Sequence, residues 1–117
     1  MNSTVDLPGV LATHMDCRPA WEPLPDKQLI SGFTSDLLSD VIVNCPEQAV
    51  LITIQGHKNT VAAASLAGAS AIVVCSGRPL PNDMVEAARN EGLALLSVQG
   101  NQFEVSCLIG KWLENDL

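Results

Sequence analysis

The stretch TSDLLSDVIVNCPEQAVLITIQGHKN, residues 34–59, decides the fold of this chain. It predicts a helix, a break at Pro46, an apolar strand over 49–54, and a polar loop that opens the next helix. The strand has almost no polar face, so it needs cover on both sides. The pattern therefore indicates a parallel or mixed sheet between helical layers.

Two further strand-and-helix units follow this stretch. An alanine-rich helix from Thr60 to Gly68 leads into an apolar strand over 71–75. A helix over 83–91, with Gly92 at its C′ position, leads into a third apolar strand over 93–98. We therefore predict an α/β fold, a three-layer α/β/α sandwich around a mostly parallel sheet.

The flanking segments are predicted from weaker patterns. Residues 1–26 are expected to form an irregular segment packed on the domain, with a short helix capped by Asp6. Residues 27–117 form the single predicted domain, in which 27–31 alternate as a strand that Gly32 ends.

Two further helices are predicted, one before the three apolar strands and one after them. The first is expected to be capped by Thr34 or Ser35, and its predicted buried face consists of Leu37, Leu38, Val41 and Ile42. The last begins at a capping box formed by Asn101 and Glu104. Its apolar residues recur at helical spacing: Val105, Leu108, Ile109, Trp112 and Leu113.

Composition limits the classes of partner. The formal charge is −7, from 13 acidic and 6 basic residues, which argues against nucleic acid and anionic membranes. The hydrophobic content is 47% and the mean hydropathy is +0.23, so we expect apolar surface to be buried in a homodimer. The last helix near Trp112 and the proline-rich segment around Trp21 are candidate dimer surfaces.

The cysteines indicate buried thiols in a reducing compartment. Cys17, Cys45, Cys75 and Cys107 form no Cys-x-x-Cys pair, and a metal or iron–sulfur site would need ligands from four separate elements. The chain does not open with a secretory signal pattern, and its longest apolar run, 61–75, is shorter than the ~18–20 residues of a membrane span. We expect a cytoplasmic protein without a metal or cofactor.

Polar loops that contain glycine follow each of the three apolar strands. Parallel strands bring their carboxyl ends to one edge of the sheet, where α/β proteins bind ligands. Backbone N–H groups, Lys58 and Arg78 could hold a phosphate or carboxylate there. The alternative is that these residues only turn the chain. The candidate ligand-binding residues are Gln55, Gly56, His57, Lys58, Asn59, Ser76, Gly77, Arg78, Gln99 and Asn101.

Catalytic interpretations receive less support from the sequence. His57 could act in catalysis or bond the backbone of its loop. Asp36 and Asp40, spaced i and i+4, could pair in acid–base chemistry or form a solvated helix face. The sequence contains neither a nucleophile elbow nor a GxxxxGK[ST] phosphate loop, so we assign no catalytic residue.

Residues 32–113 resemble the DRTGG domain family. The resemblance rests on SDLLSDV, on LITIQ followed by His57 and Asn59, on the small-residue helix leading into AIVV, and on the closing helix near Phe103. In the signature segment, DKQLISG keeps Asp26 and Gly32 but has Lys27 where Arg is expected. The resemblance implies a fold similar to the N-terminal domains of HPr kinase/phosphorylase and MurF, and a regulatory or dimerising role.

The sequence therefore predicts a non-catalytic regulatory or interaction module, dimeric, that binds a protein partner or a small anionic ligand such as a nucleotide. Two alternatives stay open at this point. One is a small phosphotransferase that uses His57 and Asp36. The other is an accessory protein of a redox or iron–sulfur enzyme system that uses the cysteines.

Overall fold

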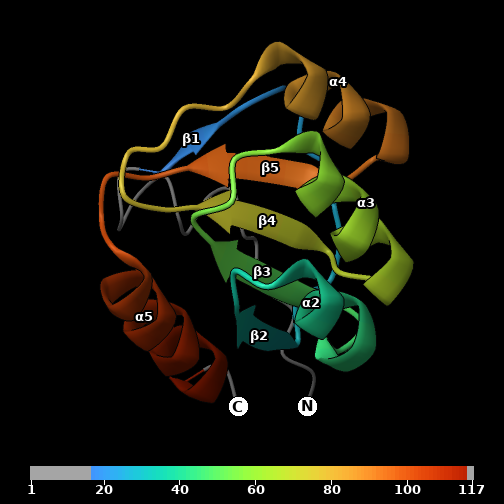
Figure 1. Cartoon of the computed structure of the whole chain (residues 1–117). Coiled ribbons are helices and arrows are strands. Elements are labelled where there is room, and N and C mark those ends of the chain that lie inside the picture. Colours follow the sequence, from blue (N-terminus) through green and yellow to red (C-terminus); the bar gives the residue numbers. More distant parts are fainter. Residues whose placement is uncertain (1–16, 116–117) are drawn as a thin grey trace.

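The computed structural model describes residues 17–115, in which five strands form one sheet (Figure 1). The strands are β1 (Arg18–Pro19), β2 (Ser31–Thr34), β3 (Ala49–Thr53), β4 (Ala71–Val74) and β5 (Ala94–Ser97). Their order in the sheet is β1-β5-β4-β3-β2. The strands β2 to β5 are parallel, and only β1 runs antiparallel to its neighbour. The predicted α/β fold with a mostly parallel sheet is confirmed.

Four helices cover the sheet in the described residues: α2 (Leu38–Asn44), α3 (Lys58–Ala67), α4 (Asn82–Glu91) and α5 (Gln102–Asn115). The helices α2, α3 and α4 lie on one face, because each connects a strand to its next neighbour in the same direction (Figure 1). The helix α5 passes to the opposite face, where it lies against β2 and β3. Helices thus lie on both faces, while the complete three-layer sandwich stays a prediction.

The three apolar strands form the centre of the sheet and are buried on both faces, as predicted. Alternate residues of each strand belong to two different core clusters. Leu51 and Ile72 pack with α2, α3 and α4, whereas Val50 and Val73 pack on the face that α5 covers. This two-sided burial explains why the strands lack a polar face.

The helix ends follow the predicted chemistry. Gly68 and Gly92 adopt the left-handed conformation, with φ of 82° and 65°, and end α3 and α4. At the start of α5, Asn101 N–H donates to Glu104 Oε1 and Glu104 N–H donates to Asn101 Oδ1, each at 2.9 Å. The predicted capping box is confirmed.

The prediction of a strand over 27–31 that Gly32 ends was wrong, because β2 spans Ser31–Thr34. Gly32 lies inside the strand and is exposed, and a Cβ there would meet Ile109 Cγ2 at an ordinary contact distance of 3.7 Å. Pairing with β3 already begins at Ile30, whose N–H donates to Gln48 O at 3.0 Å. A glycine was taken as a strand end where it instead lies inside a paired strand, opposite Val50 of β3.

The start and buried face of the first predicted helix were also placed incorrectly. Thr34 belongs to β2, and α2 begins only after Leu37, whose N–H donates to Ser35 Oγ at 3.2 Å. Val41 is fully buried, but Leu37 and Ile42 are 64% and 47% exposed. The short helix turns fewer residues toward the sheet than a longer one would.

Both tryptophans that were predicted as candidate dimer surfaces pack against the core. The indole Nε1–H of Trp21 donates to Leu93 O at 3.0 Å, next to the strand β1 that the sequence analysis did not foresee. Trp112 packs on the α5 side of the sheet. The helix predicted at Asp6 lies outside the described residues.

Candidate functional site

The loops after β3, β4 and β5 gather at one edge of the sheet and are bonded to one another. Cys75 N–H donates to Thr53 O at 2.8 Å, which extends the β3–β4 pairing. Gly77 N–H donates to Val98 O at 2.9 Å, and Ser76 N–H donates to Gly100 O at 2.8 Å. The loops therefore lie together, as expected, and hydrogen bonds join them into one rim at the edge of the sheet.

The loop after β4 contains two consecutive residues with left-handed backbone. The φ of Ser76 is 63° and that of Gly77 is 64°. Glycine adopts this conformation freely, whereas a serine does so only when its surroundings hold it there. The two N–H bonds to the loop after β5 provide that restraint, so the turn is fixed by its neighbour.

Gly56 brings the loop after β3 against the loop after β4. A Cβ at this position would lie 2.6 Å from the carbonyl oxygen of Pro79. That distance is far inside van der Waals contact, and the neighbour is backbone rather than a flexible side chain. Only glycine allows the two loops to approach so closely.

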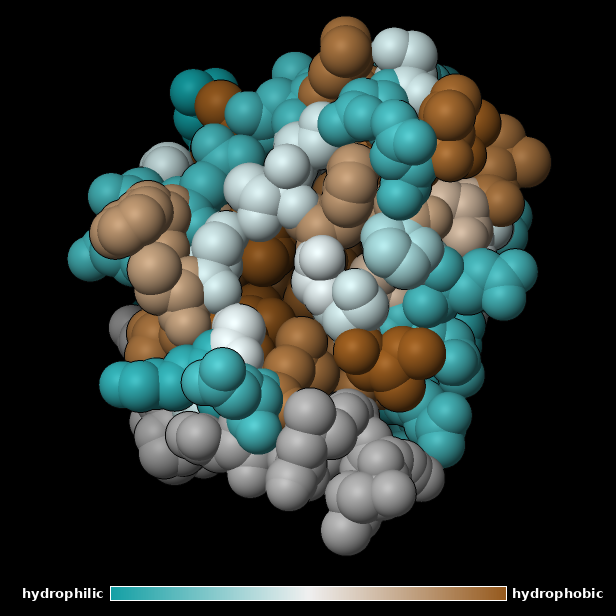
Figure 2. Space-filling view, turned by 90° about the horizontal axis from the view of Figure 1, so that it is seen from below, coloured by the Kyte–Doolittle hydropathy of each residue, from teal (hydrophilic) through white to brown (hydrophobic). Residues whose placement is uncertain are grey.

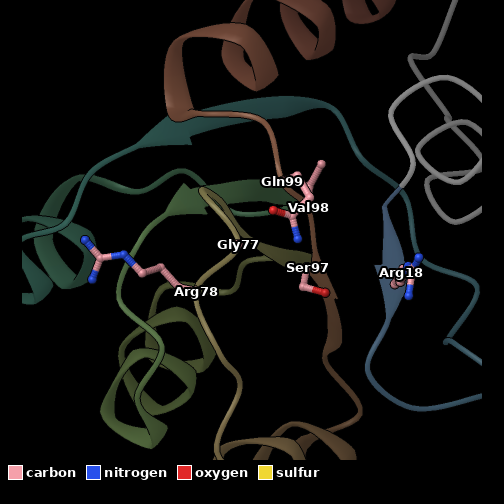
Figure 3. A pocket seen from close by; sticks show the side chains of 6 residues that line it. All are labelled: Arg18, Gly77, Arg78, Ser97, Val98 and Gln99. Atoms are coloured by element: carbon pink, nitrogen blue, oxygen red, sulfur yellow. The ribbon is translucent and has the colours of Figure 1, made fainter.

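A pocket of about 240 Å³ opens beside this rim (Figure 3). Three of the ten predicted residues line it: Gly77, Arg78 and Gln99. The lining is completed by Arg18, Ser97 and Val98. In Figure 3, Arg18 and Arg78 stand on opposite sides of the pocket, and the Arg78 side chain extends away from Arg18.

Arg18 was not among the residues predicted from the sequence. It lies in β1, where it is the register partner of Ser97, a residue 79 positions later in the chain. A strand of two residues, one of them a proline, carries no periodicity that could have placed it next to β5. The arginine enters the site through this long-range pairing, for which the local sequence gives no signal.

The other seven predicted residues lie at the same end of the molecule but do not line this pocket, and several have hydrogen bonds of their own. His57 is the N-cap of α3, and its Nδ1 accepts the Asn59 N–H at 3.0 Å. Gln55 Nε2 donates to Asp36 O at 3.1 Å, and Asn101 belongs to the capping box. The remaining members of this group are Gly56, Lys58, Asn59 and Ser76.

Asp36 is a hydrogen-bonding centre rather than half of a carboxylate pair. It lies before α2, and its Oδ1 accepts from Thr53 Oγ1 at 2.9 Å, Ile54 N–H at 2.9 Å and Gln102 Nε2 at 3.0 Å. Asp40 lies inside α2 and accepts from Asn44 Nδ2 at 2.8 Å. The two acids therefore do not share one helix face, and Asp36 joins the end of β3 to the start of α5.

The cysteines do not form a common site in the described part of the chain. Cys17, Cys45 and Cys75 are buried, while Cys107 is exposed. Burial, with a smaller contribution from Asp36, raises the pKa of the Cys75 thiol to about 11. Burial and Asp40 also raise the pKa of Cys45. Neutral thiols are poor nucleophiles and metal ligands, and residues 17–115 contain no cluster of three or more His, Cys, Asp or Glu suited to a metal.

We expect alkaline pH to destabilise the fold through Cys75. Its folded pKa is raised above the ordinary value of 9.0, so the stabilisation is complete below pH 9 and is lost as the pH rises through 11. The expected loss is on the order of 2 kcal/mol of unfolding free energy. The sequence has no tyrosine, and Cys45, whose pKa is also raised, contributes to the same decline.

Urea denaturation in reducing buffer between pH 8 and pH 11 measures this effect. Cys75→Ala serves as the control, since it removes the titrating thiol and flattens the decline. Equal slopes for the two proteins would contradict the assignment to Cys75.

The fold can be compared with known proteins. No protein-family model matches the sequence, and no curated protein matches it. Among solved structures, the chain is similar to the CBS and DRTGG domains of the regulatory region of a Clostridium perfringens pyrophosphatase, crystallised with the activator diadenosine tetraphosphate. The TM-score is 0.70 at 16% sequence identity, over 92% of this chain and 46% of that one.

The match supports a DRTGG-like fold and, at this identity, concerns the fold alone. The chain spans less than half of the structure it resembles. That structure is a regulatory region rather than a catalytic domain. In the described residues, no helix is both long and apolar enough to cross a membrane.

Proposed function

We propose that this chain is a non-catalytic regulatory module of the cytoplasm, which dimerises and binds a small anionic ligand, such as a nucleotide, at the loops after β4 and β5. The observation that carries the proposal is the pocket between Arg18 and Arg78. Neither guanidinium forms an ion pair with another described residue. In a chain with a net charge of −7, two uncompensated arginines at one pocket favour an anion.

The geometry around the pocket suits phosphate. Arg18 and Arg78 lie on opposite sides of the pocket, and the Arg78 guanidinium would turn back from its present direction to reach a ligand. The exposed side chain of Gln99 adds an amide. Arginine guanidinium groups can bind two phosphate oxygens at once. A ligand with phosphates along its length could therefore contact both arginines. The similar pyrophosphatase regulatory region was crystallised with its activator diadenosine tetraphosphate, which makes this compound the first ligand to test.

The enzyme alternatives fit the site less well. A phosphotransferase using His57 and Asp36 would need both side chains free, but His57 Nδ1 caps α3 and Asp36 Oδ1 accepts three hydrogen bonds. A thiol-based redox role would need ionisable cysteines close together. The pKa values of the buried Cys45 and Cys75 are raised, and Cys107 is exposed on α5.

Isothermal titration with diadenosine tetraphosphate, ATP, AMP and tripolyphosphate tests the proposal. We expect at least one of these phosphate compounds to bind. Arg18→Ala and Arg78→Ala are each expected to weaken its binding about tenfold or more, because each removes a charge-assisted contact.

The matched control is Lys58→Ala. Lys58 is also an exposed cation at this edge of the sheet, but it does not line the pocket, so its loss should change the affinity less than about threefold. Silence of the whole panel would refute the ligand proposal. An equal loss in the Lys58 and Arg78 variants would move the site away from the pocket.

A further inference from the structure

The strand β2 forms one edge of the sheet in the described residues. On its inner side it pairs with β3, where Ile30 N–H donates to Gln48 O. Backbone groups of a strand alternate in direction, so the N–H and C=O groups of Ser31 and Phe33 turn to the outer side. These outward groups can accept another strand.

The two edges of the sheet are not equally protected. The opposite edge strand, β1, has two residues, and these are Arg18 and Pro19. A charged side chain and a proline without an N–H group are two devices that keep edge strands from pairing with other chains. The sequence of β2 is SGFT and contains neither. Only β2 is chemically open to pairing.

An exposed apolar side chain lies beside this edge. Ile30 directly precedes β2 and is 46% exposed. Figure 2 looks onto the β2 end of the molecule, and hydrophobic residues lie along the floor of a hollow there. An unprotected backbone edge beside exposed apolar groups is a surface that a folded protein normally covers.

We propose that β2 pairs with β2 of a second copy of this chain, antiparallel across a two-fold axis. The inference rests on the dimerising part of the proposed function and assigns its surface. In this pairing Gly32 lies opposite Gly32 of the second copy. Ser31 then exchanges both backbone hydrogen bonds with Phe33 of the second copy, and the two-fold axis repeats the exchange.

Three features make a second copy the fitting occupant. The pairing is self-complementary, so one edge serves both copies. Gly32 lies at a non-hydrogen-bonded position, where Cα atoms of an antiparallel pair approach to about 4.5 Å, and it has no side chain to obstruct the approach. The strand carries no charge, so two chains of net charge −7 meet at a neutral segment, where repulsion is smallest.

Sedimentation equilibrium of the full chain tests the pairing with two substitutions at Ser31. Ser31→Pro removes the outward N–H and leaves the inward bonds of β2 in place. We expect it to raise the dimer dissociation constant roughly 30-fold or more, because two hydrogen bonds are lost across the axis. Ser31→Ala keeps the N–H and should change the constant less than about threefold. A dimer that Ser31→Pro leaves unchanged, or that Ser31→Ala weakens equally, would overturn the β2 pairing.

Amide hydrogen exchange of the unmodified chain gives a second readout that does not depend on a variant folding. The amides of Ser31 and Phe33 should exchange more slowly as protein concentration rises, while those of Ile30 and Gly32 stay protected at all concentrations. Exchange at Ser31 and Phe33 that ignores concentration would refute the pairing. A dimer formed elsewhere would leave the proposed function standing, whereas a monomeric chain would remove its dimerising part. The ligand titration is independent of both results.

Discussion

Replacing Asp36 with alanine is expected to lower the free energy of unfolding by roughly 3–4 kcal/mol. One carboxylate oxygen accepts from Thr53 Oγ1, Ile54 N–H and Gln102 Nε2. Thr53 is fully buried, so its hydroxyl could not replace the lost acceptor with water. Hydrogen bonds to charged groups contribute more than neutral ones, and a buried donor without a partner adds its desolvation cost. Urea denaturation followed by circular dichroism measures the loss.

Asp40→Ala is the matched control for this prediction. Asp40 accepts from Asn44 on the exposed surface of α2, and the loss of such a pair should cost no more than about 0.5 kcal/mol. If the two variants were equally stable, Asp36 would not be the junction between β3 and α5 that its hydrogen bonds indicate.

Replacing Gly56 with alanine is expected to cost about 2–3 kcal/mol of unfolding free energy. The new Cβ would lie 2.6 Å from Pro79 O, so the loops after β3 and β4 would have to separate. Since the loop after β4 also provides Gly77 and Arg78 to the pocket, we expect ligand affinity to fall with stability. Chemical denaturation and the phosphate titration measure the two effects.

Gly110→Ala provides the opposite expectation within the same protein. Gly110 lies inside α5, and a Cβ there would meet nothing within 4 Å. Alanine should therefore stabilise the chain by about 0.5–1 kcal/mol through its higher helix propensity. A loss of stability in this variant, or none at Gly56, would contradict the contacts described for the two glycines.

Much of the fold could be predicted because its signals are local. The central strands are continuous apolar runs, and the glycines at positions 68 and 92 and the capping box of α5 each act within a few residues of the structure they specify. Strand burial and helix capping both depend on side chains that are near neighbours in the sequence. The elements that such signals define were found close to their predicted places.

The missed features depend on contacts between distant residues. Arg18 reaches the pocket because β1 pairs with β5 at Ser97. Asp36 accepts a hydrogen bond from Gln102, which lies 66 positions later in the chain. In β2, exposed and half-buried residues alternate, but its glycine resembled a stop signal because its pairing with Val50 of β3 is not visible in the sequence. The loops could be placed on one edge from strand direction alone. Strand direction alone could not predict which of their side chains surround a pocket.

The order of strands has a consequence for how the domain assembles during synthesis. Each of β3, β4 and β5 docks beside the strand made just before it, so the growing chain can add one unit at a time as it leaves the ribosome. The exceptions are β1, which can pair only once β5 is made, and α5, the last of the described elements, which must return to β2 and β3. Until α5 is made, the face of β2 and β3 that it will cover stays open, so the nascent domain is prone to aggregate before α5 is complete.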